Sequence, residues 1–152
     1  MRYVVHSHCG GDAILSRALR EDIEEAIKSV DVPLKRGSAT RIRDAFTQVL
    51  ISKGWSDGLQ LAAGSKIAIT SCKKGAGFCF QTGNMARMYA DLLKLQTLYL
   101  NGTITCGVLV LPSAVVARKI GDNIANASRL ERELAIFKKV VSLPALIFSL
   151  EE

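Results

Sequence analysis

Two apolar runs near the end of the chain, separated by a stretch of helical character, restrict the fold most. The first run, residues 104–111, is nearly continuous in apolar side chains and is bounded by Gly102 and Pro112. The second run covers residues 143–150. Runs of this length and composition are typical of strands buried on both faces of a sheet. Because a helix lies between them, the two strands are expected to pair in parallel, which predicts a mixed α/β sheet covered by helices.

The remaining pattern supplies the helices and a hairpin for this sheet. Apolar residues at three- and four-residue spacing predict amphipathic helices, and two short segments rich in strand formers predict a β-hairpin around a polar turn at 73–75. The predicted elements are a helix over 12–30, a helix from Ser38 or Thr40 to Ile51, hairpin strands over 66–71 and 77–81, a helix over 85–100, and helical segments over 113–120 and about 127–139.

Length, charge and cysteine content set the broad class. The 152 residues fit a single domain, 1–152, with one core. A formal net charge of +6 makes nucleic acid or another polyanion a plausible partner. The four cysteines are too few and too scattered for a disulfide scaffold, and the start of the chain does not read as a secretory segment, so a reduced, cytoplasmic protein is expected. The apolar runs are too short for a membrane span.

The second hairpin strand and the helix after it carry a resemblance to a known family. The stretch Phe78-Cys79-Phe80-Gln81-Thr82-Gly83-Asn84 continues into a helix containing Tyr-Ala-Asp-Leu-Leu-Lys-Leu-Gln at 89–96. With the helix, hairpin, helix and strand order, this stretch resembles the BglII-like restriction endonucleases, which belong to the PD-(D/E)XK nucleases. The resemblance covers most of the chain and implies a nuclease-like core with a mixed sheet, hairpin plus parallel strands, flanked by helices.

The resemblance also implies an active site, and the sequence departs from it. In such nucleases an Asp on the first hairpin strand and a Glu on the second hold a divalent metal ion, and a third polar residue assists the attacking water. Counting back from Gln81 places Cys79 at the Glu position and Thr70 at the Asp position. A hydroxyl and a thiol offer Mg²⁺ no anionic oxygen. A catalytically degenerate nuclease with no metal site is therefore expected, with no cofactor unless activity survives.

Carboxylates elsewhere offer a second interpretation. Glu21, Glu24 and Glu25 lie on the first predicted helix, which in this fold often lends an acidic residue to the metal site. Together with Gln81 and Asp91 they could rebuild a Mg²⁺ site in an active, divergent DNA endonuclease. A solvated helical face is the ordinary role of such charges, and Asp91 stands two turns into its helix, far from the hairpin by this count.

The cysteines and histidines raise two weaker possibilities. His6, His8, Cys9, Cys72 and Cys79 are ligand types that zinc accepts, but their spacing matches no zinc motif, and buried or incidental cysteines are the simpler interpretation. A nucleophilic pair of Cys79 and His8 would require contact in space.

Basic and polar residues without interleaved aromatics suit contacts to phosphates more than base stacking. The residues expected to contact DNA are Arg36, Arg41, Arg43, Lys73, Lys74, Asn84 and Arg87. The resemblance implies duplex DNA as the partner, a homodimer that wraps it, and a role in restriction or phage defence. A third interpretation is a protein-interaction module or inhibitor of a nuclease relative, with the apolar helix over 85–100 as its interface.

Overall fold

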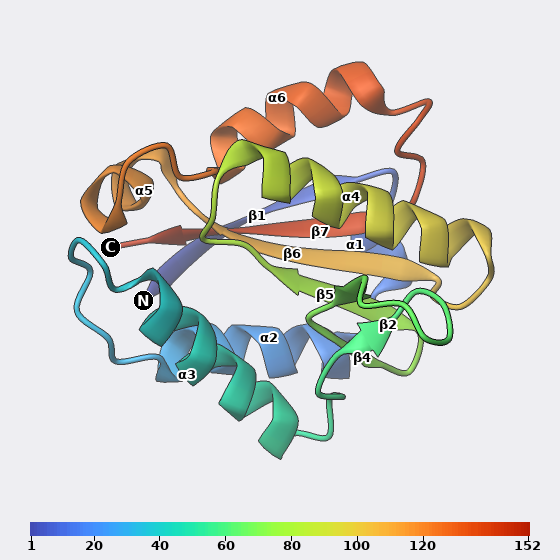
Figure 1. The fold of residues 1–152 in the computed structure, drawn as a ribbon, viewed down its shortest axis with the longest axis horizontal. Coiled ribbons are helices and arrows are strands. Elements are labelled where there is room, and N and C mark those ends of the chain that lie inside the picture. Colours follow the sequence, from blue (N-terminus) through green and yellow to red (C-terminus); the bar gives the residue numbers. More distant parts are fainter.

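A five-stranded mixed sheet forms the centre of the computed structural model, which describes residues 1–152 (Figure 1). Across the sheet the strands stand in the order β1 (Arg2–His8), β7 (Ala145–Glu151), β6 (Cys106–Pro112), β5 (Ala76–Phe80) and β4 (Ser71–Lys73). The three central strands are parallel, and β1 and β4 pair antiparallel at the two edges. The predicted mixed α/β sheet, including the parallel pairing of the two apolar runs, is confirmed.

Helices cover both faces of this sheet (Figure 1). The helices are α1 (Gly11–Ile14), α2 (Arg17–Ser29), α3 (Ala39–Ser52), α4 (Met85–Leu100), α5 (Ala114–Ile120) and α6 (Ala127–Phe137). One apolar cluster joins α2 and α3 to one face of the sheet, and a second cluster joins α4 and α6 to the other face. No helix is both long enough and apolar enough to cross a membrane.

Alternation along β5 distributes its side chains between the two clusters. Phe78 and Phe80 point toward α3, where both contact the ring of Phe46 at centroid distances of 5.4 and 5.0 Å. Cys79 points to the opposite face and joins the cluster under α4. Because successive residues of a strand face opposite sides of a sheet, Gln81, directly after β5, is expected on the same side as Cys79.

Three sequence predictions need correction. The strand β1 was not predicted, because its second half, His6, Ser7 and His8, is polar and does not alternate between apolar and polar residues. The helix expected over 12–30 is wrong in its first turn: the chain is extended at Ser16, which caps α2, and only the short α1 precedes it. The first hairpin strand is displaced: β4 overlaps the expected 66–71 only at Ser71, because residues 68–69 leave the main sheet as β3 and pair with β2 (Leu59–Gln60).

Candidate functional site

The carboxyl ends of β5, β6 and β7 lie at one end of the sheet, on the left of Figure 1, together with both chain termini. Three loops are joined there by backbone hydrogen bonds. Gly37 N–H donates to Ile120 O at 3.1 Å, and Ala125 N–H donates to Gly83 O at 2.8 Å. This end therefore collects the start of α3, the β5–α4 loop and the segment after α5.

The hairpin brings the three residues of the expected degenerate site together. Thr70 precedes β4, and its Oγ1 accepts a hydrogen bond from Phe80 N–H at 3.2 Å. Cys79 directly precedes Phe80 on β5, and the Thr70 backbone slightly opposes the rise in the pKa of its thiol. Gln81 follows one residue after Phe80, and its N–H donates to Val110 O at 2.9 Å. The positions inferred by counting are thus neighbours in space.

The Cys79 thiol is enclosed by the core. Its residue is 1% exposed and packs in the cluster that lies under α4. Burial, with a smaller contribution from the negative charge of Asp91, raises the pKa of Cys79 well above its usual value. A buried neutral thiol gives a hard cation such as Mg²⁺ neither charge nor an oxygen ligand.

Both polar atoms of the Gln81 side-chain amide form hydrogen bonds. Its Nε2 donates to Asp91 Oδ2 at 2.5 Å, and its Oε1 accepts from Gly83 N–H at 2.8 Å. Asp91 Oδ1 also accepts from Lys94 Nζ at 3.0 Å. The expected distance between Asp91 and the hairpin was therefore wrong, because α4 folds back so that its second turn lies over the end of β5. Gln81 here links the strand to the helix.

Burial governs the ionisation of Asp91. Its side chain is buried, and this raises the pKa of the carboxyl despite the opposing hydrogen bonds from Lys94 and Gln81. A folded-state pKa above the unfolded-state value means that the charged form costs stability. That cost is absent below the unfolded-state pKa, near 3.8, grows as pH rises, and is complete above the folded-state pKa.

We expect Asp91→Asn to keep or raise the free energy of unfolding at pH 7, by an amount on the order of 1 kcal/mol, since the amide needs no compensation for a buried charge. The advantage over the parent protein should disappear at pH 3, where the parent carboxyl is protonated in both states. Urea unfolding of both proteins at the two pH values measures this. If Asp91→Asn is destabilised equally at pH 7 and pH 3, the charge of Asp91 is not what costs the parent protein stability.

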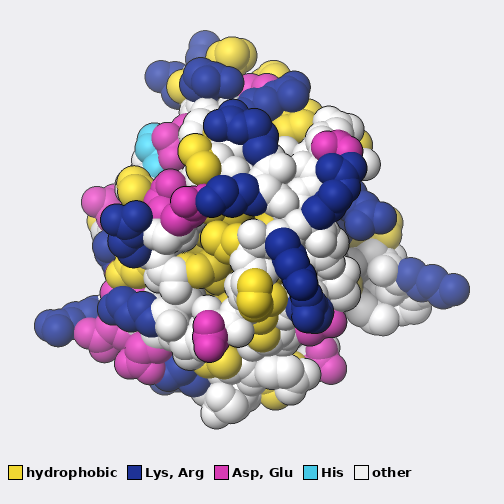
Figure 2. Space-filling view, turned by 90° about the vertical axis from the view of Figure 1, so that its left-hand side faces the viewer, with side chains coloured by type: hydrophobic (Ala, Val, Ile, Leu, Met, Phe, Trp, Pro, Cys, Tyr) yellow, Lys and Arg dark blue, Asp and Glu magenta, His cyan; other side chains and the backbone are white.

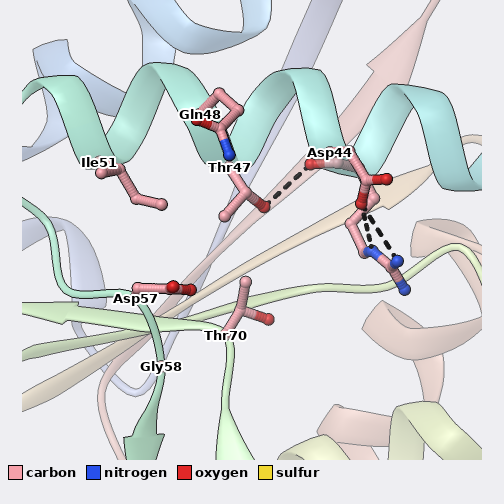
Figure 3. Close-up of a pocket in the computed structure, with 8 residues that line it drawn as sticks. Asp44, Thr47, Gln48, Ile51, Asp57, Gly58 and Thr70 are labelled. Atoms are coloured by element: carbon pink, nitrogen blue, oxygen red, sulfur yellow. Dashed lines mark hydrogen bonds and ion pairs between the residues drawn. The ribbon is translucent and has the colours of Figure 1, made fainter.

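Beside Thr70 the surface opens into a polar pocket of about 390 Å³ (Figure 3). Thr47 and Ile51 point from α3 toward Asp57 and Thr70 across it. The lining residues are Arg43, Asp44, Thr47, Gln48, Ile51, Asp57, Gly58 and Thr70. Sequence reasoning drew its carboxylates from α2, whereas α3 is the helix that faces Thr70 across this pocket. The polar residues Arg43, Asp44, Thr47 and Gln48, which share one face of α3 at helical spacing, were the available signal.

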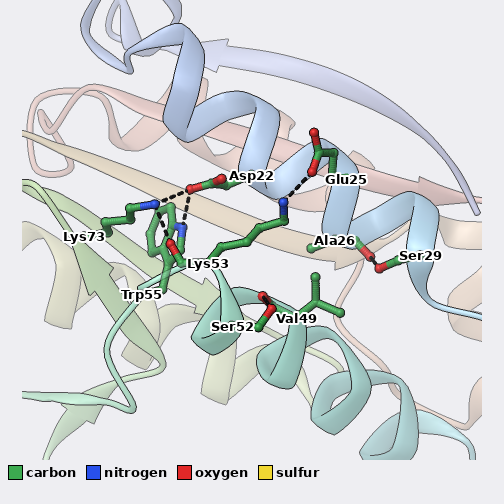
Figure 4. Close-up of polar contacts among 9 residues, drawn as sticks. All are labelled: Asp22, Glu25, Ala26, Ser29, Val49, Ser52, Lys53, Trp55 and Lys73. Carbon is green, nitrogen blue, oxygen red and sulfur yellow. Dashed lines mark hydrogen bonds and ion pairs between the residues drawn. The ribbon is translucent and has the colours of Figure 1, made fainter.

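The proposed carboxylates of α2 are engaged elsewhere. Glu21 pairs with Arg17 at 2.7 Å and Glu24 pairs with Arg20 at 2.8 Å, both along the helix. Glu25 pairs with Lys53 at the end of α3 (Figure 4). None of the three lines the pocket beside Thr70, so the structure does not bring them to the hairpin.

Lys73, expected on the DNA surface, points into a polar contact between α2 and the hairpin (Figure 4). Its Nζ donates to Asp22 Oδ2 at 2.7 Å and to Lys53 O at 2.6 Å. Trp55 Nε1 donates to the same Asp22 oxygen at 3.0 Å. Lys74, in the β4–β5 turn, stands at the amino end of β5, opposite the end where the three loops meet.

The other residues expected to contact DNA lie at the carboxyl end of the sheet, and Figure 2 shows Lys and Arg side chains spread over this side of the molecule. Arg36 and Arg43 are exposed but pair with Asp122 and Asp44. Asn84 caps α4 by accepting from Arg87 N–H at 3.1 Å. Arg41 and Arg87 are exposed and form no ion pair.

The zinc site and the cysteine–histidine pair are not formed. His8 lies on β1 and Cys79 on β5, with β7 and β6 between them. His8 Nε2 instead lies 2.6 Å from Val141 O and 3.3 Å from the Cys9 thiol. No group of three or more His, Cys, Asp or Glu side chains is placed to hold a metal ion. The residues at the hairpin therefore do not fit the Mg²⁺ that the family resemblance implies.

Comparisons with known proteins agree with the fold. A family model described as restriction endonuclease BglII/BglIII matches residues 3–150. The crystal structure of restriction endonuclease BglII complexed with a DNA 16-mer superposes with a TM-score of 0.89 at 12% identity, covering 100% of this chain and 77% of that one. The crystal structure of free BglII gives a TM-score of 0.73 at 15% identity, with coverage of 100% and 80%. No curated protein matches the sequence.

Proposed function

Because the chain belongs to the BglII/BglIII restriction endonuclease family, whose fold is a DNA-binding one, we propose that it binds duplex DNA without cutting it. The absence of cutting is inferred from the burial of Cys79 under α4. By the count back from Gln81, Cys79 takes the glutamate position of the family. Without carboxylates at positions 70 and 79 the hairpin has no charge with which to gather a metal ion.

The proposed binding of duplex DNA is inferred from the basic residues at the carboxyl end of the sheet. Arg41, in the first turn of α3, and Arg87, in the first turn of α4, are exposed cations at this end that form no ion pair. Arg36 and Arg43 add charge in exposed ion pairs, which are weak in water and open easily. Such cations contact phosphates and displace counterions from the duplex, so the expected binding is strongly dependent on salt.

We expect Arg41→Ala and Arg87→Ala each to weaken duplex binding and to reduce the magnitude of the slope of log K against log salt by about one, the contribution of one phosphate contact. Fluorescence anisotropy with a labelled duplex over a salt series, with Mg²⁺ present, measures both quantities. Lys139→Ala is the matched control, because Lys139 is exposed and lies between α6 and β7 at the opposite end of the sheet.

A denaturing gel of the same samples tests the absence of cleavage. Intact DNA in Mg²⁺ and in Mn²⁺ supports the proposal. Metal-dependent cutting would overturn it in favour of an active, divergent endonuclease, and Asp44 and Asp57 in the pocket beside Thr70 would then be the first carboxylates to replace. Absence of binding at low salt would favour the interaction module instead.

A further inference from the structure

An ion pair joins two loops at the carboxyl end of the sheet. Arg36 lies in the loop before α3, and Asp122 lies in the segment between α5 and α6. The two residues are 86 positions apart in the chain. The backbone hydrogen bond from Gly37 N–H to Ile120 O, at 3.1 Å, lies close beside this pair in the sequence of both loops. The backbone of the two loops therefore already places the two side chains near each other.

The pair has the geometry with which an arginine binds a phosphate. Arg36 Nη1 donates to Asp122 Oδ1 at 3.3 Å, and Arg36 Nη2 donates to Asp122 Oδ2. Two parallel bonds from one guanidinium to two oxygens of one anion are the usual contact of arginine with carboxylates and with phosphates alike. The Asp122 carboxylate therefore occupies the donors that a DNA phosphate would use.

The other arginines expected to contact DNA are held differently. Arg43 Nε and Nη2 both donate to a single oxygen of Asp44, the next residue along α3. Arg41 and Arg87 form no ion pair. Among these four arginines, only Arg36 binds both oxygens of a carboxylate.

We propose that Asp122 is an intramolecular competitor of DNA, which occupies the Arg36 guanidinium in the free protein until a phosphate of the duplex displaces it. This inference rests on the proposed binding of duplex DNA and adds a regulation of that surface. The Arg36 and Asp122 side chains are 74% and 78% exposed, so a phosphate has access to them. The exchange requires rotation of side chains only, because the backbone bond between the two loops need not break.

The competition lowers the affinity for DNA by a limited factor. An exposed ion pair favours its closed form by about fivefold at most, which is the factor lost when DNA opens it. The released Asp122 carboxylate also remains near the duplex, where the phosphates repel it at low salt. Asp122→Asn removes both effects, since an amide has no charge and binds a guanidinium weakly.

Fluorescence anisotropy with a labelled duplex at low salt tests the proposal. Asp122→Asn is expected to bind about tenfold more tightly than the parent, because Arg36 is then free and no carboxylate faces the DNA. Glu21→Gln is the matched control: it makes the same change in net charge, its pair with Arg17 is also exposed, and it lies on α2 outside the two loops. Equal affinities of Asp122→Asn and Glu21→Gln would overturn the proposal.

The Arg36→Ala background separates competition from simple repulsion. If Asp122 acts by holding Arg36, the gain from Asp122→Asn is about fivefold larger in the parent than in Arg36→Ala, which has no pair to open. Equal gains in the two backgrounds would overturn the competition, because Asp122 would then act through its own charge alone. Absence of binding by all of these proteins would overturn the proposed DNA binding, and this inference with it, whereas binding by Asp122→Asn but not by the parent would support the competition.

Discussion

Replacement of Asp22 by alanine is expected to lower the free energy of unfolding at pH 7 by about 2–3 kcal/mol. Asp22 joins three elements, since one of its oxygens accepts from both Lys73 and Trp55. The Asp22 and Lys73 side chains are only 18% and 21% exposed. Without the carboxylate, the Lys73 ammonium and the Trp55 N–H lose their shared acceptor in a partly dry contact between α2 and the hairpin (Figure 4).

The pH dependence of stability identifies the ion pair as the cause. Burial opposes ionisation of Asp22, but the hydrogen bonds from Lys73 and Trp55 outweigh it and lower the pKa of the carboxyl. A lowered folded-state pKa gives stability that is present above the unfolded-state value, near 3.8, and is lost as pH falls through the folded-state value. Stability of the parent should therefore approach that of Asp22→Ala in acid.

Urea unfolding at pH 7 and pH 3, followed by circular dichroism and by the fluorescence of the single tryptophan, Trp55, measures both effects. Glu21→Ala is the matched control on the same helix. Its pair with Arg17 is exposed to solvent, and such pairs contribute less than about 1 kcal/mol. Equal losses for the two variants would contradict the role given to Asp22.

This contact also shows where sequence reasoning reached its limit. Lys73 and Lys74 are indistinguishable in a sequence, and both were expected on the DNA surface. Because side chains alternate along a strand, Lys73 on β4 points toward α2, whereas Lys74 stands in the turn with a positive φ of 47°. Which lysine is internal depends on the register of a three-residue strand, and no sequence pattern fixes that register.

Elements that carry their own local signals were predictable. The helix over 85–100 was expected with the bounds that α4 has, because Asn84 caps its start and Asn101-Gly102 ends it. The two apolar strands were predictable because only a strand buried on both faces needs such a run. The strand β1 was not, because an edge strand with one free side has no need of continuous apolar residues.

The candidate site also has a part that was predictable from local sequence and a part that was not. Counting along the hairpin brought Thr70, Cys79 and Gln81 together, since spacing within one hairpin is a local property. Which helix faces Thr70 depends on packing between segments distant in sequence. The carboxylates of α2 were therefore a poor choice, and the pocket with Asp44 and Asp57 went unnoticed.

The double variant Thr70→Asp with Cys79→Glu is expected to be less stable than the parent by roughly 3 kcal/mol in the absence of metal, and to recover with Mg²⁺ or Mn²⁺. The loss follows from placing a carboxylate where Cys79 is fully buried, near the charge of Asp91. A divalent ion would neutralise the introduced carboxylates, and at a concentration one hundred times its dissociation constant it would add about 2.7 kcal/mol of stability.

Thermal unfolding with and without metal, and calorimetric titration of Mg²⁺, measure the recovery. Thr70→Asn with Cys79→Gln is the matched control, because it adds nearly the same volume at both positions without charge, and neither it nor the parent should respond to the metal. If the double variant does not fold, Thr70→Asp alone serves, since Thr70 is only half-buried at the edge of the pocket and tolerates the change; weak Mn²⁺ uptake is expected there.

These outcomes test the inference that Thr70 and Cys79 stand at the acidic positions of the family. Recovery by metal in the charged variant alone would mean that the hairpin keeps the geometry of a metal site and has lost only its ligands, so that two side chains separate this protein from metal binding. A folded variant that takes up neither Mg²⁺ nor Mn²⁺ would contradict the equivalence of Thr70 and Cys79 with the acidic positions of the family. The closed packing of Cys79 under α4, and the Gln81–Asp91 hydrogen bond that holds α4 over β5, would then mark a hairpin already rebuilt as core.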